Sequence, residues 1–308
     1  MDVRILGGLS VRENGVSITP TAAAPRQLLA LLAANADQVV PVTVLMEELW
    51  PSGPPRGARA ELQAHILDLR ALITTALRGA EPSDPTAAWL ERRTAEAVLV
   101  SLPGGYRLDT GGGSNDAWQF ERAAGAGYRA MEAGDLPRAA HRLSDALALW
   151  RGEPYAGVAA GPHLRMEIER LEVSRLSALD QWVEAQLRLG RHFEMISELS
   201  ELVARYRTNE PLHGQFMVAL LRCGRQDEAL EVYQRLSIGL KKATGTEPSA
   251  RLRRLQRSIL TVRDVPRPAF AQTSFGRPGF GDPAFGQPAF GERTSALPPA
   301  RVPAGSLV

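Results

Sequence analysis

Polar residues with the chemistry to read DNA occur together on one predicted helix. Residues 55–77 carry four large apolar side chains at steps of four, three and four: Leu62, Ile66, Leu69 and Ile73. This spacing predicts a helix with that stripe buried. The polar side chains opposite or beside the stripe are Arg59, Gln63, His65 and Arg70. Arginine pairs with guanine or phosphate and glutamine with adenine, which fits contacts in a major groove; the solvated face of an ordinary amphipathic helix has the same pattern.

Catalytic and metal-binding patterns are absent from the sequence. It contains no GxxxxGK[ST] phosphate loop, no HExxH and no GxSxG. The five histidines lack metal-ligand spacing: His65, His141, His163, His192 and His213. The single cysteine, Cys223, excludes an internal disulfide. We therefore expect no enzyme activity, no catalytic residue, no cofactor and no metal site.

Short strands and a hairpin accompany this helix in the order of a winged helix. Residues 3–18 predict short β segments with a turn at residues 13–15, and residues 98–108 predict a hairpin around Pro-Gly-Gly. In such a fold the third helix lies in a major groove, and the hairpin, or wing, reaches the adjacent backbone or minor groove. The wing candidates are Gly104, Gly105, Tyr106 and Arg107.

Two helices are predicted before the one at residues 55–77. The first starts at Pro25 and runs to about Ala36, and Arg26 beside its start is a candidate phosphate contact. The second covers residues 42–49, with Thr43 as N-cap. Its two acidic residues, Glu47 and Glu48, are expected to face outward. A further short helix is predicted at residues 87–96.

The composition is typical of a globular protein, and the sequence predicts no membrane span. The chain has 308 residues, of which 44% are hydrophobic and 23% charged, which allows two domains. No apolar run approaches the roughly 20 residues that a membrane helix needs. The first residues lack the pattern of a secretory signal, so we expect a cytoplasmic location. Residues 1–110 hold 10 arginines and 12 acidic residues, a net charge of −2 that gives no bulk attraction for nucleic acid.

After residue 114 the sequence predicts helices almost throughout. Gly111–Ser114 predicts a flexible junction, which divides a domain at residues 1–110 from an all-α domain at residues 114–263. Three Gly-Xaa turns begin at Gly134, Gly190 and Gly224, and the last two are 34 residues apart. That is the period of a tetratricopeptide repeat, although an ordinary helical bundle remains the alternative.

The chain ends in a segment rich in proline, glycine and phenylalanine. Residues 264–308 have a five-residue rhythm with phenylalanine in register at residues 270–290. So much proline and glycine cannot build a packed core, and the composition predicts disorder. The segment is either a spacer, or its regular phenylalanines contact a partner or other copies of the chain.

Several fragments resemble the SARP (antibiotic-pathway regulatory protein) transcriptional activators. PRQLLALLAANADQVVPVTVLMEELW, ELQAHILDLRALI and VSLPGGYRL resemble their OmpR-type winged helix. The later fragments DAWQFERAAGAGYRAMEAGDLPRAAHRLSDALALWRGEPY, RLGRHFEMISELSELVARY and LLRCGRQDEALEVYQRL resemble their bacterial transcriptional activation domain. The resemblance covers roughly residues 3–262. It implies a mainly α fold with small β elements: a winged helix, a TPR-like helical domain and a tail.

The resemblance also implies a function and its partners. Such proteins activate a biosynthetic gene cluster by binding promoter direct repeats as paired subunits and recruiting RNA polymerase. Where the family's third helix commonly reads SRLRR, this chain has Leu67-Asp68-Leu69-Arg70-Ala71, so one of three basic positions remains. The alternative function is a protein-interaction scaffold whose winged helix binds DNA weakly or not at all. A regulator gated by a small molecule is a third possibility.

Overall fold

The computed structural model describes residues 1–78 and 93–263. The predicted tail at residues 264–308 lies outside the described residues, as does most of the helix predicted at residues 87–96. Strands and helices follow in this order: β1 (Asp2–Arg4), β2 (Ser10–Glu13), β3 (Val16–Ser17), α1 (Ala23–Ala34), β4 (Val40–Pro41), α2 (Val42–Leu49), α3 (Ala58–Arg78), α4 (Ala95–Val98), β5 (Leu99–Leu102), β6 (Gly105–Leu108), β7 (Ser114–Asn115), α5 (Asp116–Glu132), α6 (Leu136–Leu147), α7 (Pro162–Arg188), α8 (Met195–Arg205), α9 (Glu210–Arg222), α10 (Gln226–Thr244) and α11 (Ala250–Arg263).

A four-stranded sheet opens the fold, in the order β3-β2-β1-β7. The predicted turn between β2 and β3 is confirmed, with Asn14 and Gly15 both at positive φ. The flexible junction predicted at Gly111–Ser114 is wrong in its last residue. Ser114 and Asn115 form β7, which pairs parallel to β1 beside Asp2 and Val3. The chain therefore enters the helical region from within the N-terminal sheet.

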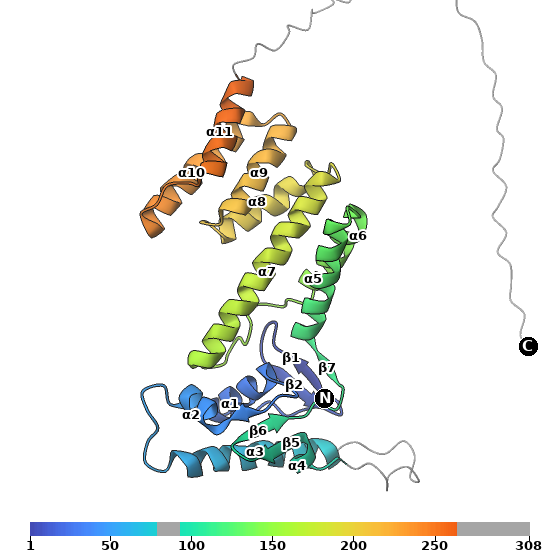
Figure 1. Ribbon diagram of the computed structural model, residues 1–308, viewed down its shortest axis with the longest axis vertical. Helices are drawn as coiled ribbons and strands as arrows, with labels where there is room; N and C mark the ends of the chain where they lie inside the picture. The colour runs from blue at the N-terminus through green and yellow to red at the C-terminus, as the bar shows by residue number, and fades with distance from the viewer. Residues whose placement is uncertain (79–92, 264–308) are drawn as a thin grey trace, which may run out of the picture. The chain divides into compact units, whose positions relative to one another are not determined.

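Helices α1, α2 and α3 and a second sheet, in the order β4-β6-β5, complete the winged helix (Figure 1). The hairpin predicted at residues 98–108 is confirmed: Ser101 pairs with Tyr106 and Leu102 with Gly105. Two details of the helix starts differ from the prediction. Helix α1 begins at Ala23, which leaves Pro25 in its first turn, and the N-cap of α2 is Pro41 rather than Thr43.

In the described part of the chain seven helices follow, and a glycine turns the chain between the two helices of each of three pairs. Gly134 lies between α5 and α6, Gly190 between α7 and α8, and Gly224 between α9 and α10, each at a positive φ of 75–82°. A glycine adopts this left-handed conformation without a steric cost, which lets it end a helix sharply. The helices in the first and last of these pairs pack closely against each other. The TPR-like arrangement of helical pairs is thus confirmed.

Two hydrophobic cores meet along α7. The first collects buried side chains from the N-terminal sheet, α1–α3, the wing strands, α5, α6 and the first half of α7, as far as Ala178. The second starts at Leu179 and includes buried side chains of α8–α11. The winged helix and the first helical pair therefore share one core. Within the described residues, no helix is long and apolar enough to cross a membrane.

Candidate nucleic-acid interface

Helix α3 buries its apolar stripe and exposes the opposite face. Leu62, Ile66, Leu69 and Ile73 are each no more than 2% exposed, as the spacing predicted. On the other side Arg59 and Gln63 are exposed. Helix α3 packs against α1, α2, α4 and β2. Its outer face, defined here by Arg59, Gln63, Leu67, Asp68 and Ala71, is exposed among the described residues.

Arg70 does not belong to this outer face. Its guanidinium donates two hydrogen bonds to the Leu99 carbonyl, at 3.2 and 2.8 Å, and one to the Ser101 hydroxyl at 3.0 Å. Leu99 and Ser101 lie on β5, so the side chain joins α3 to the wing. The base contact predicted for Arg70 stays a prediction. Its hydrogen bonds within the fold give it a second role, which is to position the wing beside α3.

His65 flanks the outer face and is largely enclosed. Its imidazole is 16% exposed and lies 3.8 Å from a carboxylate oxygen of Glu61 and 4.0 Å from one of Asp68. Its Nε2 is buried and makes no hydrogen bond. The two acidic neighbours repel a phosphate that approaches the ring. His65 is thus placed to orient Asp68 more directly than to touch DNA.

The wing presents its tip and buries its base. Gly104 is exposed at the turn with φ of +81°, which a side chain would strain. Gly105 is buried, and a Cβ there would stand 2.6 Å from the Val40 carbonyl oxygen, so glycine permits the pairing of β6 with β4. Tyr106 is half-buried and packs against the first core. Of these candidates, Gly104 is the one open to a ligand, while Gly105 and Tyr106 support the wing.

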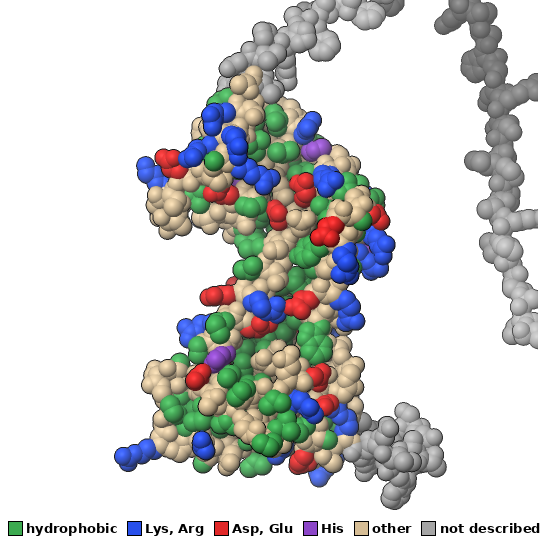
Figure 2. Space-filling model, viewed as in Figure 1, with side chains coloured by type: hydrophobic (Ala, Val, Ile, Leu, Met, Phe, Trp, Pro, Cys, Tyr) green, Lys and Arg blue, Asp and Glu red, His purple; other side chains and the backbone are tan. Residues whose placement is uncertain are grey.

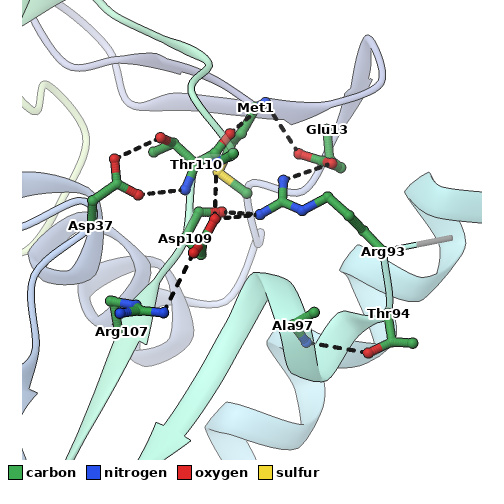
Figure 3. A network of polar contacts seen from close by, with 10 residues as sticks. Met1, Glu13, Asp37, Arg93, Thr94, Ala97, Arg107, Asp109 and Thr110 are labelled. Carbon is green, nitrogen blue, oxygen red and sulfur yellow. Dashed lines mark hydrogen bonds and ion pairs between the residues drawn. The ribbon is translucent and has the colours of Figure 1, made fainter. Parts of the chain in front are cut away.

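Arg107 is held by a polar network at the base of the wing (Figure 3). Its guanidinium lies 3.5 Å from Asp109, which also accepts a 2.7 Å hydrogen bond from Arg93. Arg93 lies 3.6 Å from Glu13 of β2. The Arg107 side chain is about one-third exposed, although its Nε is buried. The network fixes the angle between the wing and the N-terminal sheet.

Arg26 also makes its contacts within the protein. Its Nε donates to the Pro20 carbonyl at 2.8 Å, and its Nη1 donates to the Gly157 carbonyl at 3.3 Å. Gly157 belongs to the connection between α6 and α7. The structure therefore places Arg26 at the junction with the helical region, which competes with the phosphate contact predicted for it.

Two exposed arginines extend the outer face beyond the predicted residues. Arg56 precedes α3 and Arg78 ends it, and both are exposed. At the lower end of the view in Figure 2, where α3 lies, basic, acidic and hydrophobic side chains are mixed and no single charge dominates. Sequence reasoning missed these arginines because they lie at the two ends of α3, whereas the predicted contacts were chosen beside the apolar stripe.

Glu48 links the winged helix to the helical region. Its carboxylate accepts hydrogen bonds from the backbone amides of Gly161 at 2.6 Å, His163 at 2.9 Å and Leu164 at 3.1 Å. The residue is 1% exposed, so the expectation that it faces outward is wrong. The reason is that α2 packs on the start of α7, and the carboxylate satisfies amides that the first turn of α7 leaves free.

A groove of about 780 Å³ lies in the helical region and has a strongly charged lining. Asp180, Glu184, Arg188, Arg222 and Arg251 are among the residues that line it. Burial, with Glu184 nearby, raises the pKa of Asp180. The described residues contain no group of three or more histidine, cysteine or acidic side chains that could hold a metal ion.

Known proteins similar to this chain are regulatory proteins. Residues 115–260 match the family model of the bacterial transcriptional activator domain. Regulatory protein DnrI of Streptomyces peucetius is 46% identical over 260 residues, which are 84% of this chain and 92% of that protein. Transcriptional regulator RedD of Streptomyces coelicolor is 32% identical over 84% of this chain and 70% of its own length.

A solved structure shares the fold. Mycobacterium tuberculosis EmbR, in complex with a low affinity phosphopeptide, superposes with a TM-score of 0.72 at 29% sequence identity. The match covers 85% of this chain, which spans 65% of that EmbR chain. The predicted fold class, a winged helix followed by a TPR-like helical domain, is thereby confirmed for the residues that the structure describes.

Proposed function

Because the chain belongs to the SARP family of transcriptional activators, we propose that it activates a biosynthetic gene cluster by binding promoter DNA through the outer face of α3. The observation that carries this proposal is the position of α3. Its apolar stripe is buried, its opposite face is exposed, and Arg70 holds the wing next to it. A helix with these surroundings fits into a major groove about 12 Å wide.

Arg59 and Gln63 are the proposed base contacts, and Arg56 and Arg78 the proposed phosphate contacts. Few cations are available, so affinity from counterion release is small. With about two phosphates neutralised per subunit, the logarithm of the binding constant falls with the logarithm of salt concentration at a slope of roughly −2. Paired subunits on direct repeats add their separate contacts, which compensates for the weak single site.

The helical domain is proposed to hold the paired subunits together and to recruit RNA polymerase. The protein acts in the cytoplasm, without catalysis and without a cofactor. Since α2 and α7 are joined through Glu48, a DNA-bound winged helix carries the first helical pair and α7 with it. The helical domain is thereby placed at a fixed position beside the promoter.

A gel shift with promoter fragments from the neighbouring genes, at low and moderate salt, tests the proposal. Specific retardation that survives moderate salt supports it. An absence of retardation at every salt concentration contradicts it and favours the second candidate, a protein-interaction scaffold. The scaffold is motivated by two observations: Arg70 is occupied within the fold, and the charged groove between α7, α9 and α11 suits a partner.

A further inference from the structure

Leu67 is a large aliphatic side chain exposed in the middle of the outer face of α3. It is 63% exposed, and its neighbours on that face, Ala64 and Ala71, are small and also exposed. Residues four apart stack on one side of a helix, so Gln63, Leu67 and Ala71 form a line. At a rise of 1.5 Å per residue the line is about 12 Å long, which corresponds to three or four base pairs.

The chemistry of this line differs between its centre and its ends. Leu67 has no attraction for a phosphate, and the carboxylate of Asp68, 67% exposed beside it, is repelled by one. Arg56 precedes α3 and Arg78 ends it, and both are exposed. These two arginines are thus available for the phosphates on either side of a groove. Leu67, at the centre, meets the base edges on the groove floor.

One group on the floor of a major groove is apolar: the 5-methyl group of thymine. From this match we propose that Leu67 reads thymine by packing against its methyl group, so that the duplex this protein prefers carries thymine opposite the centre of α3. The inference rests on the proposed function, since it identifies the DNA sequence that the same site recognises.

Replacing thymine by deoxyuridine removes that methyl group and changes nothing else in the base pair. A duplex is first selected from a random pool by the full chain, and is then synthesised with deoxyuridine at each thymine in turn. Affinities are measured by fluorescence anisotropy for the wild type, Leu67→Ala and Ile238→Ala. Ile238 is 68% exposed on α10 and serves as the matched aliphatic control.

For the wild type, deoxyuridine at one or two positions weakens binding about fourfold, the effect of one buried methyl-sized group. Leu67→Ala binds the thymine duplex more weakly by a similar factor and no longer distinguishes deoxyuridine from thymine. Ile238→Ala behaves as the wild type does.

The outcomes separate this inference from the proposed function. If the wild type binds a selected duplex but every deoxyuridine duplex binds equally well, the inference is wrong and DNA binding stands. The same conclusion follows if Leu67→Ala keeps the full sensitivity to deoxyuridine, because the methyl group then contacts another residue. If no duplex is selected at all, both the proposed function and the inference fail.

Discussion

The carboxylate of Glu48 accepts a 2.6 Å hydrogen bond from the backbone amide of Gly161, across 113 residues of sequence. Gly161 is the N-cap of α7 and has no side chain to cap that helix, so a residue of α2 supplies the missing acceptor. A Cβ on Gly161 would overlap the Glu48 carbonyl oxygen. The contact requires both residue types, and it connects the winged helix with the longest helix of the helical region.

Glu48→Ala is expected to lower the free energy of unfolding by about 2–4 kcal/mol. The substitution leaves the amides of Gly161, His163 and Leu164 without their acceptor in a buried place. Urea denaturation followed by circular dichroism measures the change. Glu47→Ala is the matched control: its carboxylate, 64% exposed, pairs with His163 at the surface, and its loss is expected to cost less than about 1 kcal/mol. Equal effects of the two substitutions would contradict the capping role.

Arg70→Ala is expected to act on stability as well as on DNA affinity. Its three hydrogen bonds to β5 are lost, which lowers the free energy of unfolding by about 1–3 kcal/mol. Arg59→Ala removes an exposed side chain and is expected to change affinity while leaving stability within about 0.5 kcal/mol. Paired measurements of denaturation and DNA affinity compare them. An Arg70→Ala variant with unchanged stability would contradict the role of Arg70 in holding the wing.

Gly105→Ala is expected to disturb the wing more than a substitution at its tip. The new Cβ would stand 2.6 Å from the Val40 carbonyl oxygen and 2.8 Å from Val39 Cγ1, so β4 and β6 must separate. The expected cost is about 1–3 kcal/mol. Gly104→Ala meets no atom within 4 Å and adds only the strain of positive φ, about 1 kcal/mol. A Gly104 variant less stable than the Gly105 variant would show that the close approach is relieved.

His213 is expected to make stability depend on pH below neutrality. Burial lowers the pKa of this histidine below its ordinary value of about 6.5, and nearby Arg235 acts in the same direction. The unfolded chain therefore binds the proton more readily, so this contribution to stability is full above pH 6.5 and is lost as the pH falls through the lower pKa of the folded state.

The test measures the free energy of unfolding as a function of pH for the wild type, His213→Gln and His141→Gln. His213→Gln is expected to flatten the fall in stability between about pH 7 and 5. His141, 73% exposed on α6, is expected to leave that dependence unchanged. A wild type that loses no more stability in acid than His213→Gln would show that burial does not disfavour the imidazolium.

Local sequence patterns predicted the helices and turns well because these elements depend on interactions between neighbouring residues. The apolar stripe of α3 and the glycine turns after α5, α7 and α9 each depend on a few neighbouring residues, and they appear where they were expected. Contacts between distant segments were not visible in this way. Glutamate is a residue type that usually faces solvent, and the partners of Glu48 lie 113–116 residues away in the sequence.

The candidate site was predicted only in part for the same reason. Helical spacing places Arg59 and Gln63 on the exposed face correctly. It cannot reveal that the guanidinium of Arg70 is taken by β5, because that depends on where the wing packs. Leu67 departs from the family pattern, but only its exposure in the fold gives it a place in the site.

The most direct test of the central claim is the affinity of a selected duplex for the wild type and for Arg59→Ala/Gln63→Ala, measured by fluorescence anisotropy at moderate salt. Each lost base contact is expected to cost about 1–3 kcal/mol, so the double variant binds at least tenfold more weakly. Arg138→Ala, an exposed arginine at the start of α6, should bind as the wild type does. If the double variant binds the duplex as tightly as the wild type, the outer face of α3 is not the DNA-binding surface.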